Sequence, residues 1–308
     1  MTDPLPGAAL SDAALSDAAL SDDGLPEFCA RLGIPGLFDA HVHFLPPRVM
    51  QKVWSYFDAA GPLTGREWPI TYRWSDGERV AHLERMGVLR FSALPYAHKP
   101  GIAEFLNDWA ADFADTYGNA LRSATFYPEP EAGAYVRARI DAGTEIFKTH
   151  IQVGEFDPTD PMLDEVWGAL TDSQTPVVVH AGSGPAPGRF TGPELIGRVL
   201  AAFPTLPMIV AHMGVPEYGA FLDFAERYPN VRLDTTMVFT DFTEETTPFP
   251  TDDLGRLKDL QPRVLLGSDF PNIPYAYAHQ VEALARLDLG DDWLRDVLWR
   301  NGLALFDA

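Results

Sequence analysis

The chain has 308 residues, of which 46% are hydrophobic, so it is long enough to bury one large core. Its 23 Lys and Arg residues against 44 Asp and Glu residues give a formal net charge of −21. This charge would repel a phosphate backbone and disfavours binding to nucleic acid. The single cysteine, Cys29, excludes an intramolecular disulfide. Because neither a signal peptide nor an uninterrupted apolar run of about 18 residues is found, we expect a cytoplasmic protein without a membrane partner.

A five-residue repeat, Ala-Ala-Leu-Ser-Asp, fills residues 8–22. Leucines spaced by five residues cannot stay on one face of a helix that has 3.6 residues per turn. We therefore expect residues 1–30 to form a disordered acidic tail. Residues 31–308 are expected to form a single domain, although two small domains are an alternative on length alone.

From residue 36 onward, short runs rich in β-branched and aromatic residues alternate with longer amphipathic stretches. This alternation is typical of repeated βα units with parallel strands. Eight runs predict strands over 37–43, 88–94, 121–127, 145–151, 177–180, 208–212, 231–235 and 264–269. The amphipathic stretches predict helices over 102–117, 131–142, 162–173, 194–203, 217–228, 254–260 and 292–306.

Eight parallel strands separated by helices predict an α/β fold of the (β/α)8 type, the TIM barrel, because closure leaves no exposed sheet edge. An open, doubly wound sheet is the alternative. Its phosphate-binding signature, Gly-x-Gly-x-x-Gly, is missing after the first strand. A glycine-rich stretch follows the fifth strand, but Pro185 and Pro187 would interrupt a helix there.

The connection from residue 44 to 76 is too long for an ordinary βα loop. It carries Trp54, Tyr56, Phe57, Trp68, Tyr72 and Trp74. Each aromatic ring taken singly is expected to pack a small insertion against the barrel. The insertion follows strand 1 at the end where barrel enzymes bind their substrates, so it is a candidate substrate lid.

Polar side chains stand where the hydrophobic strands end. They are His41 and His43 after the first strand, Lys148 and His150 after the fourth, His180 after the fifth, His212 after the sixth and Asp269 after the eighth. The C-terminal ends of barrel strands converge on one mouth, so we expect these side chains to share one site.

This set of side chains suits one divalent metal ion. His41 and His43 are two residues apart on a strand and face the same side, while Asp39 lies one step deeper and is expected to orient the histidines. Together with His180 and Asp269 they would bind Zn²⁺ or a similar ion and leave a position open for water. The ion would lower the pKa of that water and so provide a nucleophile without a serine or cysteine.

The strand-end residues lie in motifs that resemble those of the amidohydrolase superfamily, in particular the amidohydrolase-related branch that includes aminocarboxymuconate semialdehyde decarboxylase. The motifs are FDAHVH at 38–43, FKTH at 147–150, VHAG at 179–182, AHMG at 211–214, LGSDFP at 266–271 and NGLALF at 301–306. The resemblance implies that His41, His43, His180 and Asp269 ligate one catalytic metal, usually Zn²⁺. It also implies that His212 is the acid/base and that Asp269 can share its proton.

The resemblance leaves two roles for the fourth strand end. In superfamily members with two metals a carboxylated lysine bridges the ions, and Lys148 takes that position. In this branch one metal is the commoner arrangement, and Lys148 or His150 would then contact the substrate. We expect one metal, with Lys148 and His150 binding a small-molecule substrate, and the same resemblance suggests a homodimer.

Two reactions fit this frame. The leading hypothesis is hydrolysis of an amide, ester or lactone, and the alternative is nonoxidative decarboxylation of an unsaturated or aromatic acid by a zinc-dependent carboxy-lyase. A decarboxylase needs a cation to hold the carboxylate, and among Arg48, Arg73 and Arg189 we choose Arg189 for this role. A barrel that only binds metal for stability is a third hypothesis, which the additional His212 disfavours.

Overall fold

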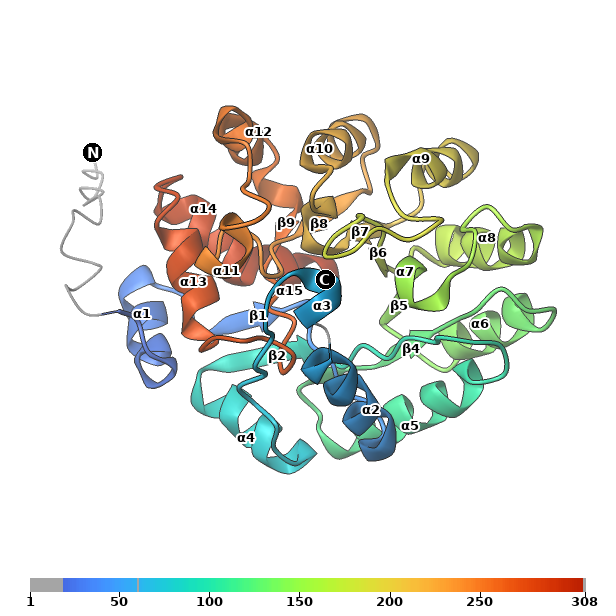
Figure 1. Ribbon diagram of the computed structural model, residues 1–308, viewed down its shortest axis with the longest axis horizontal. Coiled ribbons are helices and arrows are strands. Elements are labelled where there is room, and N and C mark those ends of the chain that lie inside the picture. The colour runs from blue at the N-terminus through green and yellow to red at the C-terminus, as the bar shows by residue number, and fades with distance from the viewer. Residues whose placement is uncertain (1–18, 60, 307–308) are drawn as a thin grey trace, which may run out of the picture.

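A ring of parallel strands surrounded by helices forms the body of the molecule in the computed structural model, which describes residues 19–59 and 61–306 (Figure 1). The strands are β1 (Leu37–Asp39), β2 (Val88–Ser92), β3 (Ala120–Leu121), β4 (Ser123–Thr125), β5 (Ile146–His150), β6 (Val177–His180), β7 (Met208–Val210), β8 (Arg232–Asp234) and β9 (Val264–Leu265). Their pairings are parallel and join neighbours in chain order. The predicted (β/α)8 barrel is confirmed.

Two details complete the ring. The third predicted strand is interrupted at Arg122, so that β3 and β4 together occupy one position of the barrel. The first and last strands meet through the backbone, where Ala40 N–H donates to Leu266 O at 2.9 Å and His43 N–H donates to Phe270 O at 2.7 Å. These bonds close the sheet at the end where the predicted site residues lie.

The helices are α1 (Leu25–Leu32), α2 (Pro47–Asp58), α3 (Gly61–Thr64), α4 (Asp76–Arg85), α5 (Ala103–Thr116), α6 (Ala132–Asp141), α7 (Ile151–Gly154), α8 (Asp164–Ser173), α9 (Pro193–Ala202), α10 (Tyr218–Arg227), α11 (Asp241–Glu244), α12 (Leu254–Asp259), α13 (Ala278–Ala285), α14 (Asp291–Arg295) and α15 (Asn301–Phe306). The predicted helices are all present, whereas α1, α2, α3, α4, α7, α11 and α13 were not predicted. Among the described residues, none of these helices is long and apolar enough to cross a membrane.

The barrel interior is apolar at one end and polar at the other. The inward-facing cluster consists of Phe38, Ala40, Leu94, Leu121, Ile146, Val178, Ile209, Ala211 and Leu265. Phe306 of α15 stacks on Phe38 with ring centroids 5.4 Å apart, so the last helix covers this apolar end. Two residues further along β5 and β6, the same strand faces carry Lys148 and His180. Because side chains alternate along a strand, the inward face of each strand holds core residues first and site residues at its end.

The ordered fold begins earlier than the sequence predicted. Asp22, just before α1, accepts hydrogen bonds from Tyr72 Oη at 2.6 Å, His82 Nε2 at 2.9 Å and Ala278 N at 2.9 Å. The helix that follows buries Leu25, Phe28, Cys29 and Leu32. The predicted disordered tail is therefore wrong for residues 22–30. Most of the repeat, residues 8–18, lies outside the described residues.

The segment between β1 and α4 lies over the barrel mouth, where α2 and α3 stand in front of the strand ends (Figure 1). Two of its tryptophans bind the loop that follows β9. Trp54 Nε1 donates to Asn272 Oδ1 at 3.2 Å, and Trp68 Nε1 donates to the Asn272 carbonyl at 2.7 Å. The segment therefore spans from the first strand of the barrel to the last.

Candidate active site

His41, His43 and Asp269 direct their ligand atoms toward one point at the mouth of the barrel. Nε2 of His41 lies 3.2 Å from Nε2 of His43, and Oδ1 of Asp269 lies 3.0 Å from His43 Nε2 and 3.8 Å from His41 Nε2. Ligands of a tetrahedral zinc ion at roughly 2.0–2.1 Å would be about 3.3 Å apart. The observed separations match such a geometry, and the three residues form a group that could hold a metal ion.

The protonation of the two imidazoles supports this reading. Nδ1 of His41 donates to Oδ2 of Asp234 at 2.8 Å, and Nδ1 of His43 donates to the Leu94 carbonyl at 2.9 Å. Burial and the nearby Lys148 charge hold the pKa of His41 well below its usual range, so its Nε2 carries a lone pair. A single proton can join only two of the three converging atoms, whereas a cation can bind all of them.

Asp234, at the end of β8, is a central residue that the sequence analysis missed. Its Oδ2 holds His41, while its Oδ1 accepts the backbone N–H of His212 at 2.8 Å and that of Thr236 at 3.1 Å. The carboxylate is fully buried. Its position at the end of a hydrophobic strand, like that of Asp269, was the available signal.

Asp39 is fully buried and accepts hydrogen bonds from a backbone amide and a hydroxyl group. Its Oδ1 accepts the backbone N–H of His41 at 3.0 Å, and its Oδ2 accepts the hydroxyl of Tyr277 at 2.8 Å. Burial raises the pKa of Asp39 to about 7. It therefore positions the backbone that carries His41, in line with the orienting role that was predicted for it.

His212 and Asp269 both adopt the left-handed backbone conformation, with φ of 54° and 69°. Side chains other than glycine rarely take it, and such strain is concentrated at functional sites. Each is held by its own N–H group, which donates to Asp234 Oδ1 in the case of His212 and to the His41 carbonyl at 2.9 Å in the case of Asp269. Gly267 allows the backbone before Asp269 to lie close to His41, since a Cβ at position 267 would be only 2.9 Å from the His41 Cβ.

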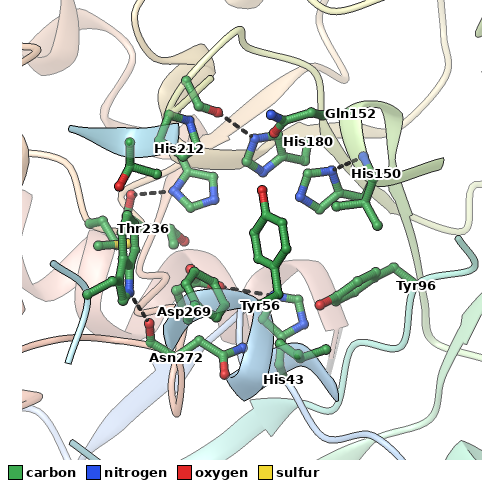
Figure 2. A pocket seen from close by; sticks show the side chains of 18 of the residues that line it. His43, Tyr56, Tyr96, His150, Gln152, His180, His212, Thr236, Asp269 and Asn272 are labelled. Carbon is green, nitrogen blue, oxygen red and sulfur yellow. Dashed lines mark hydrogen bonds and ion pairs between the residues drawn. The ribbon is translucent and has the colours of Figure 1, made fainter. Parts of the chain in front are cut away.

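His150, His180 and His212 form the opposite wall of the site (Figure 2). The rings of His150 and His180 stack with centroids 3.9 Å apart, and the His212 ring stands edge-on to His180 at 4.7 Å. His180 Nε2 donates to the Gly184 carbonyl at 3.0 Å, which leaves Nδ1 as the acceptor nitrogen. His180 is not a member of the three-residue group that could hold a metal, so its role as fourth ligand stays a prediction.

The other two rings carry their protons differently. His212 Nδ1 donates to the Thr236 carbonyl at 3.1 Å, so Nε2 is left with a lone pair. Burial lowers the pKa of His212 to about 4. In His150 it is Nδ1 that accepts, from Val153 N–H at 3.4 Å, so the neutral ring has its proton on Nε2. The wall thus combines a hydrogen-bond acceptor, His212 Nε2, with a hydrogen-bond donor, His150 Nε2–H.

Lys148 projects from β5 into the same centre, and its Nζ lies 3.2 Å from His41 Nε2. Burial lowers the pKa of this buried lysine to about 8, against the attraction of Asp234 and Asp269. The predicted placement of Lys148 beside the histidines therefore agrees with the structure. Its contact with a substrate, and its carboxylation, remain predictions.

A cavity of about 1010 Å³ opens above these residues, at the upper limit of common small-molecule sites, which span roughly 300–1,000 Å³. Tyr56 of α2 points into it, toward the histidine wall, and Tyr96 stands beside it (Figure 2). The Tyr96 ring contacts both His43 and His150, with centroids 5.3 and 5.6 Å apart. Tyr96 was not predicted as a site residue, because it lies in the loop after the second strand.

The arginines considered as carboxylate anchors lie in three different settings. Arg189 is exposed, its guanidinium carbon lies 4.9 Å from the Phe190 ring centroid, and it is not among the described residues that line the cavity. Its predicted substrate contact is therefore not supported. Arg73 is paired with Asp58, whereas Arg48 lines the cavity.

The comparisons with known proteins agree with this geometry. The amidohydrolase family model matches residues 38–308, which is most of the chain and includes all of the strand-end residues described above. The chain belongs to the amidohydrolase family. Comparison with curated protein sequences gave no significant match.

Solved structures of the same fold include enzymes of both reaction classes. An uncharacterised TIM-barrel protein from Bordetella bronchiseptica is 20% identical, with a TM-score of 0.68 over 88% of this chain and 98% of that one. A 5-carboxyvanillate decarboxylase from Novosphingobium aromaticivorans, complexed with manganese and a nitrobenzoic acid, is 15% identical, with a TM-score of 0.62 over 90% and 97%. A probable 2-pyrone-4,6-dicarboxylic acid hydrolase from Acinetobacter baumannii is 12% identical, with a TM-score of 0.56 over 89% and 100%. At these identities the similarity establishes the fold.

Proposed function

We propose that the protein is a metal-dependent hydrolase that cleaves an amide, ester or lactone of a small molecule. The observation that carries this proposal is the convergence of His41 Nε2, His43 Nε2 and Asp269 Oδ1 within 3.8 Å of one another, with both Nδ1 atoms already bound. His180 Nδ1 is proposed as the fourth ligand atom. One Zn²⁺ ion suits this set of nitrogen and carboxylate donors.

The residues around the centre can manage the protons of a hydrolysis. A divalent ion held there would supply an activated water molecule and polarise the substrate carbonyl. His212 Nε2 can take a proton from that water and pass it to the leaving group as the acyl bond breaks. His150 Nε2–H and Lys148 Nζ can donate hydrogen bonds to substrate oxygens. Burial opposes the ionisation of Asp269, but a cation bound beside it would favour the carboxylate form.

Nonoxidative decarboxylation is the second candidate. It is favoured by Lys148, whose ammonium group lies at the cavity floor where it could hold a substrate carboxylate. A similar structure is that of a decarboxylase of an aromatic acid. In this reaction the bond to the carboxyl carbon breaks, carbon dioxide leaves, and a proton takes its place on the substrate. His212 would deliver that proton instead of removing one from water.

A substrate screen that follows two products separates the candidates. Purified protein is incubated with esters, lactones, amides and aromatic acids, while new carboxylic acids are quantified by liquid chromatography and carbon dioxide release by a coupled assay. The proposed hydrolase forms acid from at least one acyl compound, and the His212→Asn variant does not. Carbon dioxide release without acid formation from any acyl compound would overturn hydrolysis in favour of decarboxylation.

A further inference from the structure

The few lysines of this acidic protein are gathered at one place. The chain has four lysines, at positions 52, 99, 148 and 258, and the first three line the cavity. Lys148 belongs to the buried centre, while Lys52 and Lys99 are exposed at its opening. With 44 acidic residues in the chain, a random distribution would surround the opening with carboxylates. Glu155 and Asp269 are the carboxylate residues among the described lining, and Asp269 belongs to the metal centre.

Arg48 joins the two exposed lysines to form a group that we call the basic rim, Arg48, Lys52 and Lys99. Arg48 and Lys52 are four residues apart on α2 and so share one face of the helix. Lys99 follows β2, next to His98. Lys52, His98 and Lys99 all line the same cavity. Partial burial lowers the pKa of His98, and the charges of the two lysines lower it further.

The basic rim carries charge that the protein itself does not neutralise. Within the described ranges, no carboxylate forms an ion pair with Arg48, Lys52 or Lys99, whereas Arg66 and Arg73 of the same segment pair with Glu245 and Asp58. Unpaired cations side by side repel one another, and a pocket focuses their field toward its interior. An anion that enters the opening would relieve this repulsion.

Part of the cavity lining is apolar. Val53 and Tyr56 of α2 line the cavity here, and Figure 2 shows the Tyr56 side chain directed toward the histidine wall. A ligand that reaches from the centre to the opening must therefore pass a hydrophobic stretch before it meets positive charge. The two polar ends of the cavity are chemically different.

We propose that the substrate carries an anionic group, a carboxylate or a phosphate, at the end remote from the scissile bond, and that Arg48, Lys52 and Lys99 bind it. The proposal rests on the hydrolytic function proposed above and adds the substrate class to it. An apolar or aromatic part of the substrate lies against Val53 and Tyr56. The basic rim thus determines specificity without taking part in the reaction.

Binding of two-ended inhibitors tests this proposal. The probes are linear hydroxamates of increasing chain length, whose hydroxamate end binds the metal and whose other end is a methyl, a carboxylate or a phosphate group. Isothermal titration calorimetry compares the purified wild-type protein with the double variant Lys52→Gln/Lys99→Gln. The control is Lys258→Gln, which removes one positive charge from the exposed surface of α12, outside the described cavity lining.

At the best chain length we expect the wild type to bind an anion-ended probe about fivefold to tenfold more tightly than its methyl-ended partner. The preference should fall to within about twofold in the double variant, persist in Lys258→Gln and weaken with added salt. The better of the carboxylate and phosphate ends identifies the anion. Equal affinities at every length in the wild type, or an unchanged preference in the double variant, would overturn the proposal.

A failure of the proposed function gives a different result. If no hydroxamate binds the wild type, the metal-centre proposal fails. The basic rim is then judged with ω-phenylalkanoates and the matching uncharged ω-phenylalkanols on the same variants. A carboxylate preference that depends on Lys52 and Lys99 would still support the basic rim, and its absence would reject it.

Discussion

Replacement of Asp234 by asparagine should weaken metal binding, although Asp234 is not itself a proposed metal ligand. In the wild type, Oδ1 of Asp234 accepts the backbone N–H groups of His212 and Thr236, and Oδ2 accepts Nδ1–H of His41. An asparagine can keep the two backbone bonds with its one oxygen, but it then turns an NH2 group toward His41. Because two donors cannot face each other, the His41 proton must move to Nε2, where it blocks the proposed ligand lone pair.

The size of the effect follows from the role of such a partner. Loss of a carboxylate that orients a ligand histidine typically lowers metal affinity by about 10- to 100-fold, which corresponds to about 1.4–2.8 kcal/mol. Competition for Zn²⁺ with a chromophoric chelator measures the affinity, and circular dichroism confirms that the variant is folded. Asp259→Asn, on the exposed surface near the end of α12, is the control and should bind Zn²⁺ like the wild type. A folded Asp234→Asn protein with wild-type affinity would refute the proposed hydrogen-bond relay.

Three further predictions concern other parts of the structure. His180→Ala should lower the metal content of the purified protein, whereas His279→Ala, on the outer helix α13, should not; undiminished metal in the first variant would exclude His180 as a ligand. For His212→Asn we expect metal to be retained and turnover to fall by about 100-fold or more, and in the wild type the rate should drop only as the pH falls toward the His212 pKa of about 4, where the base becomes protonated. Full activity of His212→Asn would remove its acid/base role. Asp22→Ala should lower the free energy of unfolding at pH 7 by about 2–4 kcal/mol, measured in urea, because a buried charge-assisted hydrogen-bond network is lost. Burial alone would raise the Asp22 pKa, but its bonds with His82 and its other partners lower it, so this stability is present above the unfolded value of 3.8 and is lost as the pH falls below it; an effect of equal size at pH 3 and pH 7 would contradict this account.

The barrel and the metal-binding group could be predicted because both follow from local rules applied to strands. Alternation along β5 and β6 places Lys148 and His180 on the inward face, and parallel strands bring all their C-terminal ends to one mouth. His41 and Asp269 are therefore neighbours, although 228 positions separate them in the sequence.

The features that sequence reasoning missed depend on partners that no local pattern reveals. Asp234 stands at a strand end like Asp269, but its importance comes from bonds to His41 and His212, which only the folded barrel provides. The start of the fold was misplaced because Asp22 looks like part of the acidic repeat until its contact with His82 is seen. Arg189 was chosen for its place after a strand, yet it is exposed and is not among the described residues that line the cavity.

The basic rim was missed for a related reason. Residues 44–76 were interpreted only as an aromatic-rich insertion, so the helix α2 was not predicted, although Val49, Val53 and Phe57 recur at helical spacing. Arg48 and Lys52 become one feature only when the helix places them a turn apart and the fold sets Lys99 near them. Whether the chain forms a homodimer, and where it is located in the cell, stay predictions from the sequence.

The number of divalent ions bound per chain tests the central claim most directly. Elemental analysis of the purified protein, repeated after dialysis against Zn²⁺, gives this number for the wild type and for the double variant His41→Ala/His43→Ala. The proposed centre predicts about one ion per chain in the wild type and none above background in the variant. Two ions per chain, or one ion retained in the folded variant, would contradict the single-metal site described above.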